Sequence, residues 1–328
     1  MRNVLSNTAP EFQGAMLRAL RETGEMSIGA LRALTPFTEN AQKVIDTAVV
    51  KVGLERLAVA KEILSEGLIY SLPNPLSVME VQWDQQSKAG GAIRVMNPKA
   101  RGENGLLDRR PKRIPVYITM DDFNIGVRSF QMSQRIGTPI DVSLVEEATR
   151  RVNEAIEDAT INGAGVQVDG YSTYGILTAP NANTSTLTAT WVTTTGDNIV
   201  SDTLVMIGKL QADKKFGPYT LFVGTTVSNH LNTDFKANGS LTIKQRLEQI
   251  EAGGRNLKIV VADQMPATTV VLMQMTSDVV DMISGQSPTV VPWTSPDGFT
   301  LYWAVMAIMV PRVRDDYDGN SGIVIGTP

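Results

Sequence analysis

The chain has 328 residues, of which 42% are hydrophobic and 20% charged, and its formal net charge at neutral pH is −4. This composition is typical of a globular protein with a substantial core, and the slightly acidic balance gives no reason to expect a general nucleic-acid-binding surface. The chain contains no cysteine, which excludes disulfides, thiolate nucleophiles and cysteine-bound zinc or iron–sulfur sites.

No segment of the sequence has the pattern of a secretion signal or a membrane anchor. Residues 1–13 are polar and lack the basic start and apolar core of a signal peptide. The most apolar run, Phe299 to Val310, is well short of the ~20 residues that cross a bilayer, and a buried strand explains it better. We therefore expect a protein that is made in a cytoplasm and has no contact with a membrane.

The N-terminal residues 1–45 carry a weak helical pattern that glycines and a proline interrupt. Such a segment gains little from a core of its own, so it is compatible with an arm that grips a neighbouring molecule and equally with a floppy terminus. Residues 41–65 then show apolar side chains at helical spacing. Asn74-Pro75 ends any helix and starts an extended segment.

Two strands with a long connection follow. Val78 to Trp83 is predicted to be one strand and Arg113 to Phe123 its return partner, because apolar and polar residues alternate along the second segment and predict one buried and one wet face. Residues 84–112 lie between them, whereas hairpin loops normally take ~2–5 residues. A connection of this length is uncommon unless it is functional, so residues 77–123 are predicted to form a projecting two-stranded arm.

The arm is strongly basic. From Trp83 to Arg113, eight basic and three acidic residues give a charge of +5, which leaves −9 for the rest of a chain whose net charge is −4. Opposite charges on two parts of one chain favour contact between copies, although a solvated loop is an alternative. A nucleic-acid-binding arm is disfavoured because no aromatic residue follows Trp83 in this segment. The residues predicted to contact a neighbouring copy are Lys88, Arg94, Lys99, Arg101, Arg109, Arg110, Lys112 and Arg113.

The clearest helix is predicted from Thr138 to Gly163. Thr138 is a suitable N-cap, Pro139 occupies the first helical position, and Asn162-Gly163 supplies a left-handed stop. At ~1.5 Å per residue the helix spans roughly 35 Å, the width of a domain. Its apolar stripe is Leu144, Val145, Ala148, Val152, Ala155, Ile156 and Ala159. Its solvent face is predicted to carry Glu146, Glu147, Arg150, Arg151, Glu154, Glu157 and Asp158.

After Gly163 the pattern changes to an alternation of helices and strands, which predicts a second, α/β lobe around a mixed sheet over residues 165–296. Helices are expected at Asn198–Lys215, Ser228–Phe235 and Leu241–Glu251, and strands at Tyr219–Val223, Lys258–Val261, Thr269–Met275 and Val279–Ile283. A final apolar strand, Phe299 to Val313, is expected to return to the first lobe.

Side chains that could support catalysis or bind a metal are scarce. His230 is the single histidine, and no partner lies near it in sequence, so a surface or capping role is favoured over catalysis. Asp316, Asp318 and Asn320 imitate the start of a calcium loop, but the glycine is displaced and Thr327 stands where the bidentate glutamate belongs. We therefore predict no enzyme activity, no catalytic residue, no cofactor and no metal.

The order of parts resembles that of HK97-fold shell proteins, the major capsid proteins of tailed bacteriophages and the related encapsulins. Local similarity runs from Arg113-Ile114-Pro115-Val116-Tyr117-Ile118 through Gly137-Thr138-Pro139-Ile140-Asp141 to Gly170-Tyr171-Ser172-Thr173-Tyr174-Gly175. The resemblance implies an α+β fold of six segments. These are an N-terminal arm (1–45), the first part of a peripheral domain (46–76), an extended E-loop (77–123), the peripheral domain with its spine helix (124–164), an axial domain (165–296) and a C-terminal strand that returns to the peripheral domain (297–328).

The same resemblance implies a structural subunit that self-assembles, as pentamers and hexamers, into an icosahedral phage head around double-stranded DNA, after assembly in the host cytoplasm. Separate scaffolding, portal and decoration proteins are possible partners, and DNA would be contacted without sequence specificity. An encapsulin-type shell that houses a cargo enzyme is the alternative within the same fold. A cytosolic α/β enzyme with the long loop as an active-site lid is the alternative from another class.

Overall fold

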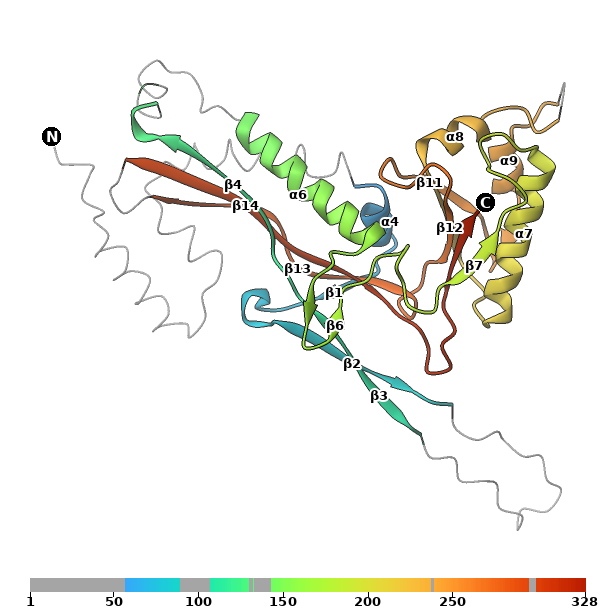
Figure 1. The fold of residues 1–328 in the computed structure, drawn as a ribbon, viewed down its shortest axis with the longest axis horizontal. Coiled ribbons are helices and arrows are strands. Elements are labelled where there is room, and N and C mark those ends of the chain that lie inside the picture. The colour runs from blue at the N-terminus through green and yellow to red at the C-terminus, as the bar shows by residue number, and fades with distance from the viewer. Residues whose placement is uncertain (1–56, 89–106, 130–131, 133–142, 237–238, 295–298) are drawn as a thin grey trace, which may run out of the picture. The chain divides into compact units, whose positions relative to one another are not determined.

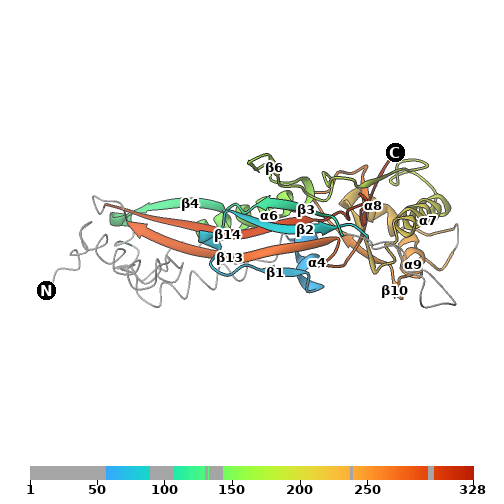
Figure 2. The same ribbon diagram turned by 90° about the horizontal axis from the view of Figure 1, so that it is seen from below.

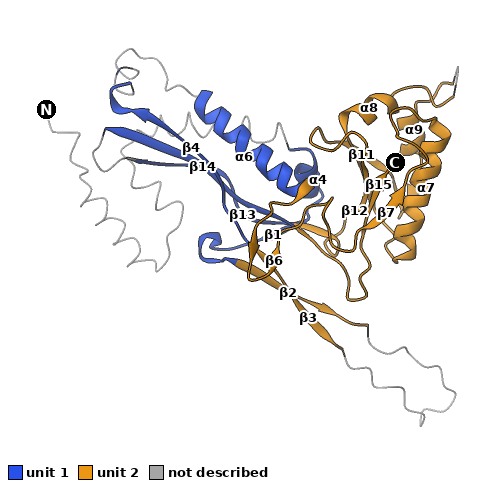
Figure 3. Cartoon of the chain, in the orientation of Figure 1, with its two compact units in different colours: residues 1–79, 116–160, 282–311 blue, residues 80–115, 161–281, 312–328 orange. Residues whose placement is uncertain are grey.

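The computed structural model describes residues 57–88, 107–129, 132, 143–236, 239–294 and 299–328. The chain divides into two compact units, each assembled from separate stretches of sequence (Figure 3). Unit 1 comprises residues 1–79, 116–160 and 282–311, and unit 2 comprises residues 80–115, 161–281 and 312–328. Because the chain passes repeatedly from one unit to the other, neither unit is a continuous segment.

Unit 1 is built on a four-stranded sheet in the order β1-β13-β14-β4, which Figure 2 shows from below. β1 (Ile69–Ser71) runs parallel to β13 (Val280–Thr294), and β14 (Thr300–Val313) runs antiparallel to β4 (Thr119–Gly126). β14 is the apolar strand predicted at Phe299–Val313, and most of its side chains are buried on both faces. The predicted final strand is therefore confirmed as a central strand of this sheet.

The predicted spine helix is α6 (Ser143–Asn162), which lies with α4 (Val59–Ser65) beside the sheet of unit 1 (Figure 1). The predicted N-cap residues lie outside the described part of the chain. Most of the predicted apolar stripe is buried, namely Val145, Ala148, Val152, Ile156 and Ala159, whereas Leu144 and Ala155 are exposed.

One residue of the predicted solvent face of α6 is misplaced. Glu157 is completely buried, and its carboxylate accepts hydrogen bonds from the backbone nitrogens of Val59 (2.7 Å) and Ala60 (3.1 Å). These donors belong to the first turn of α4, which has no helical acceptors of its own. The prediction for Glu157 was wrong because a side chain from a distant helix serves here as the cap, which a helical pattern cannot show.

Unit 2 contains a five-stranded mixed sheet in the order β11-β8-β12-β15-β7. Its strands are β7 (Asn183–Thr186), β8 (Tyr219–Val223), β11 (Lys258–Val261), β12 (Val270–Gln274) and β15 (Ile323–Thr327), and its helices are α7 (Gly196–Ala212), α8 (Thr225–Leu231) and α9 (Ile243–Glu248). Ile199, Met206 and Leu210 of α7 pack in one core with Leu221, Leu272 and Val324 of the sheet. A lobe of helices around a mixed sheet is found as predicted, but its members differ from the prediction. The strand expected at Val279–Ile283 is the start of β13, which lies in the sheet of unit 1, and β15, from outside the predicted range 165–296, lies in the sheet of unit 2.

The remaining short elements are η1 (Pro75–Ser77), β5 (Gln167–Val168), β6 (Tyr171–Ser172), β9 (Glu251–Ala252) and β10 (Arg255–Asn256). β5 pairs with β6 and β9 pairs with β10, each as a separate antiparallel ribbon. In the described part of the chain, no helix combines the length and the apolar character needed to span a membrane.

The single return strand predicted from Arg113 to Phe123 is two strands. β3 (Arg109–Pro115) belongs to unit 2, and β4 begins at Thr119 in unit 1. β3 ends at Pro115, and residues 116–118 separate it from β4. The break changes the alternation, so Met120 is exposed although the pattern placed it on the buried face.

Candidate assembly interface at the arm root

The arm root is the two-stranded ribbon of β2 (Glu80–Gln86) and β3 (Arg109–Pro115), both in unit 2 (Figure 1). The strands are antiparallel, in a register that pairs Glu80 with Pro115 and Gln86 with Arg109. Residues 89–106, which connect the strands, lie outside the described residues. Three of the eight predicted contact residues, Arg94, Lys99 and Arg101, are among them.

Residues paired directly across two strands share a face of the ribbon, so the register divides the arm root into two faces. We call them the braced face and the open face. The braced face consists of the pairs Val81/Ile114, Trp83/Lys112 and Gln85/Arg110. The open face consists of the pairs Glu80/Pro115, Gln82/Arg113, Asp84/Pro111 and Gln86/Arg109.

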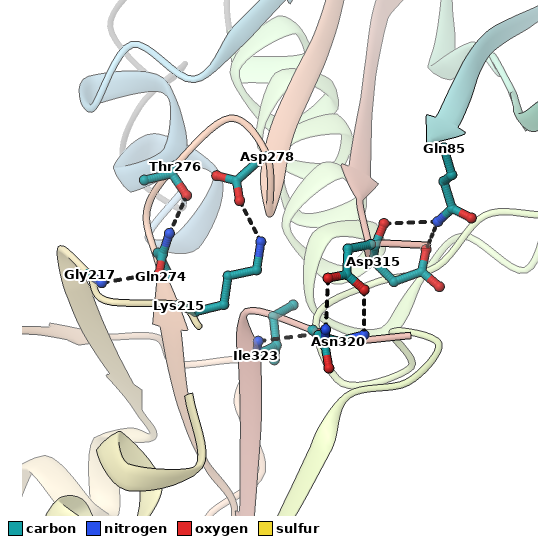
Figure 4. Close-up of polar contacts among 11 residues, drawn as sticks. Gln85, Lys215, Gly217, Gln274, Thr276, Asp278, Asp315, Asn320 and Ile323 are labelled. Carbon is teal, nitrogen blue, oxygen red and sulfur yellow. Dashed lines mark hydrogen bonds and ion pairs between the residues drawn. The ribbon is translucent and has the colours of Figure 1, made fainter. Parts of the chain in front are cut away.

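The braced face contacts a turn near the C-terminal end of the sequence, residues 315–320, which we call the C-terminal turn. The side-chain nitrogen of Gln85 donates to the backbone oxygen of Asp315 (2.8 Å) and to its Oδ1 (2.5 Å), as Figure 4 shows. The Asp315 Oδ2 accepts from Asn181 (2.8 Å) and lies 3.8 Å from the ammonium nitrogen of Lys112. A single carboxylate thus joins β2, β3 and the segment before β7.

Further along the arm, the contacts with the turn are ionic and aromatic. The Lys88 ammonium group forms an ion pair with Asp318, and the hydrogen bond from Lys88 to Asp318 raises the pKa of the lysine. The guanidinium carbon of Arg110 lies 4.2 Å from the ring centroid of Tyr317, within the range of a cation–π interaction. The Tyr317 hydroxyl donates to Asp108, and this hydrogen bond raises the pKa of the tyrosine.

The C-terminal turn is itself ordered by local hydrogen bonds. Asp316 accepts from the backbone nitrogen of Asn320 and from its side-chain nitrogen, both at 2.8 Å. Burial alone would raise the pKa of Asp316, but the hydrogen bonds from Asn320 outweigh burial and lower this pKa below its ordinary value. Of the three residues that resemble a calcium loop in sequence, Asp316 and Asn320 are therefore hydrogen-bonded to each other within the turn, and Asp318 pairs with Lys88.

Just before the turn in sequence, Arg312 and Arg314 form a buried ionic cluster with Asp281, and this cluster contacts β2 of the arm. Arg312 is only 2% exposed and donates from Nε (2.8 Å) and an η nitrogen (2.5 Å) to Asp281, which is 6% exposed. Arg314 donates to the same carboxylate (2.6 Å). Burial lowers the pKa of Arg314, an effect that the charge of Asp281 opposes. The Arg312 guanidinium also lies 5.3 Å from the ring centroid of Trp83 on β2.

The outer part of the open face presents its side chains to solvent, whereas Pro115 at its base is buried. Gln82, Asp84, Gln86, Arg109 and Pro111 are exposed. Arg113 is half-buried, 3.5 Å from Glu80 and 5.8 Å from the ring centroid of Tyr171. Of the predicted contact residues, the described ones therefore separate into Lys88, Arg110 and Lys112, which contact the C-terminal turn, and Arg109 and Arg113, which lie on the open face.

Sequence reasoning missed the acidic and aromatic partners of the arm. Gln85 and Asp315 are 230 positions apart, so no local pattern links them. The one available signal was charge: the acidic run at residues 315–318 could have been matched to the basic arm.

The described residues offer no constellation for catalysis or metal binding. No group of three or more His, Asp or Glu side chains that could hold a metal ion occurs among them. His230 is half-buried on α8, and its Nδ1 makes no hydrogen bond.

The sequence was compared with protein-family models and with curated protein sequences. A family model described as a family of unknown function, DUF6260, matches residues 85–326. No curated protein sequence shows detectable similarity to the chain.

Several solved structures share the fold. The virus-like particle protein from Pyrococcus furiosus superposes with a TM-score of 0.61 at 15% identity, over 88% of this chain and 99% of that one. The capsid of the Myoviridae phage XM1 gives a TM-score of 0.62 at 15% identity, over 83% and 93% of the two chains. A chain from Mycobacterium phage Bobi gives 0.58 at 11% identity, over 84% and 92%. The chain therefore has the HK97-like fold of phage capsid proteins, as the order of its parts predicted.

Proposed function

We propose that this chain, which belongs to the DUF6260 family of proteins of unknown function, is a structural subunit that self-assembles into a closed icosahedral shell. The observation that carries the proposal is a basic two-stranded arm with one face held by its own chain and the other left open, on a fold shared with capsid proteins. We propose no catalytic role, since the described polar groups do not converge on a substrate site.

Charge supports contact between copies. The arm segment carries +5 and the remainder of the chain −9, so the arm of one copy is attracted to the body of another. A contact between two different surfaces of identical subunits is heterologous, and such contacts close into rings and shells when the rotation between subunits closes. Pentamers and hexamers are the expected rings.

For the contents of the shell, we favour double-stranded DNA in a tailed-phage head that is assembled in a bacterial cytoplasm and becomes part of the virion. Scaffolding, portal and decoration proteins would then be separate chains. An encapsulin-type compartment with an enzyme as cargo is the second candidate. It is favoured by the similarity to the Pyrococcus furiosus virus-like particle, which extends over 99% of that chain.

The proposal is tested by expressing the whole chain and imaging the purified protein by negative-stain electron microscopy. We expect closed, uniform particles. A protein that stays monomeric over a wide range of concentration and salt would contradict assembly by this chain alone. The same result after coexpression with its genomic neighbours would refute the proposal.

A second experiment separates the two candidates. Particles purified from their natural source are treated with nuclease before and after opening, and the protected material is analysed. Protected double-stranded DNA together with tails supports the phage head. A DNA-free shell that contains a second protein supports the compartment.

A further inference from the structure

The two faces of the arm root differ in the contacts that stabilise them. A two-stranded ribbon is only marginally stable in water and needs another surface to hold it. At the base of the ribbon, Val81 and Ile114 are buried, so this part is stabilised by apolar packing. Farther out, where the side chains become polar, the C-terminal turn supplies the second surface.

We propose that the C-terminal turn is a brace that fixes the arm from one side, so that the open face is presented to a second copy of this chain. The brace consists of the contacts from Lys88, Arg110, Lys112 and Gln85 to the turn. The docking surface consists of the open face, with Arg109 as its exposed cation without an ionic partner among the described residues. The docking half of this inference depends on the proposed function.

The individual contacts of the brace are weak, and their contributions add up. Lys88 is 59% exposed and Asp318 47% exposed, so water and salt screen their attraction. Lys112 contacts Asp315 at 3.8 Å, at the outer limit of an ion pair. Exposed pairs of this kind contribute little singly, but here several of them act on the same ribbon. The order of the arm should therefore depend on ionic strength.

A braced arm binds its partner at a lower entropic cost. An arm that is mobile before docking must be ordered during docking, and that ordering reduces affinity. Because the brace occupies Lys88, Arg110 and Lys112, these cations are already satisfied within the chain. The open face, with Arg109 and Pro111, is what remains for a neighbour.

The brace is tested on the unassembled subunit by hydrogen exchange of the backbone amides in β2 and β3. The variants are Lys88→Glu, Asp318→Lys and the double exchange of both charges. We expect each single variant to exchange about two- to fivefold faster in the arm, the change that one exposed ion pair supports. The double variant should return toward the rate of the unmodified protein.

The matched control is Lys244→Glu on α9. Lys244 forms an exposed ion pair with Glu248, 3.9 Å apart, within one helix. This variant changes the net charge as Lys88→Glu does, so arm exchange should remain unchanged. The brace is refuted if the single variants leave arm exchange unaltered, or if the double variant exchanges as fast as the single ones.

The docking surface is tested by Arg109→Glu. This variant should keep the arm exchange of the unmodified protein and yet reduce particle formation, whereas Asp318→Lys should disturb both. Normal assembly of Arg109→Glu would overturn the assignment of the open face. If the unmodified chain forms no particles even when it is coexpressed with its genomic neighbours, the proposed function fails, but the exchange experiment still decides on the brace.

A cross-link distinguishes a permanent brace from a latch that must open. The chain has no cysteine, so Lys88→Cys combined with Asp318→Cys can be joined selectively by a short bismaleimide. We expect the cross-linked subunit to assemble as well as the unmodified protein, because the cross-link replaces the ion pair that the two substitutions remove. Failure of the cross-linked subunit alone would show that the turn must release the arm, which contradicts the proposal.

Discussion

Replacing Asp281 by asparagine should strongly destabilise unit 2. The substitution keeps the shape of the side chain but removes the only acidic group that the described contacts give to both Arg312 and Arg314. Arg312 is 2% exposed and cannot turn its guanidinium to water. Removing one partner of a buried ion pair costs about 3–5 kcal/mol, because the remaining charge loses the opposite charge that offsets its burial. Two like charges would also remain near each other.

Hydrogen exchange of the β12 amides is the suitable assay, because it reports on unit 2 alone and does not require the whole chain to unfold in one step. A loss of 3–5 kcal/mol corresponds to exchange that is faster on the order of a hundred- to a thousandfold, where the amides exchange through unfolding of the unit. Measurements belong on unassembled subunits, since assembly would itself protect these amides.

The matched control is Asp278→Asn, three positions earlier in the chain. Asp278 pairs with Lys215, but its side chain is 58% exposed. Burial alone would raise the pKa of Asp278, whereas the hydrogen bond from Lys215 lowers it, and solvent screens the pair. The loss should therefore stay below about 1 kcal/mol.

A compensating variant tests the cause. Arg312→Met in the Asp281→Asn background removes the buried charge of the guanidinium and keeps an unbranched side chain over Trp83. At least half of the lost stability should therefore return. Arg314 is 26% exposed and can reach solvent. The reasoning is refuted if Asp281→Asn exchanges no faster than Asp278→Asn, or if the added Arg312→Met destabilises the protein further.

Three other changes have defined outcomes. Glu157→Ala removes the acceptor for two backbone donors of α4 and should destabilise unit 1 by about 2–3 kcal/mol, measured by exchange of the β14 amides. Gly175→Ala would place a Cβ 2.3 Å from a backbone nitrogen and should lower the melting temperature. Gly208→Ala, with no neighbouring atom within 4 Å of the added Cβ, should increase the free energy of unfolding by about 0.5–1 kcal/mol and raise the melting temperature slightly. Because the folded pKa of Asp316 is lowered, its contribution to the C-terminal turn is present at neutral pH and is lost as the pH falls below roughly 4, which faster arm exchange in acid should reveal. A turn that keeps protecting the arm well below that pH would contradict this role of Asp316.

The sequence predicted those elements whose own side chains determine them. The strands Tyr219–Val223 and Lys258–Val261 have the predicted bounds, because each is a short apolar run between polar or turn-forming residues. The spine helix was predicted from its apolar stripe. In both cases the pattern along the chain reflects the burial of the same residues.

The failures occurred where a distant segment decides the outcome. Glu157 follows the polar pattern of a solvent face and is buried because α4 begins against it. β15 was not predicted, because its five residues follow a polar, glycine-containing turn and become a strand only by pairing with β12 and β7. The basic arm was predicted as a contact surface, but the division of its cations between two faces depends on Asp315 and Tyr317, more than 200 positions away.

The position of β15 makes the folding of unit 2 dependent on the order of synthesis. β15 lies between β12 and β7, and its residues leave the ribosome after those of every other strand in that sheet. The C-terminal turn comes only a few residues earlier, so the sheet and the support of the arm are completed at nearly the same moment. A nascent or prematurely terminated chain would expose two unpaired strand edges and an unsupported arm, and such edges invite wrong pairing.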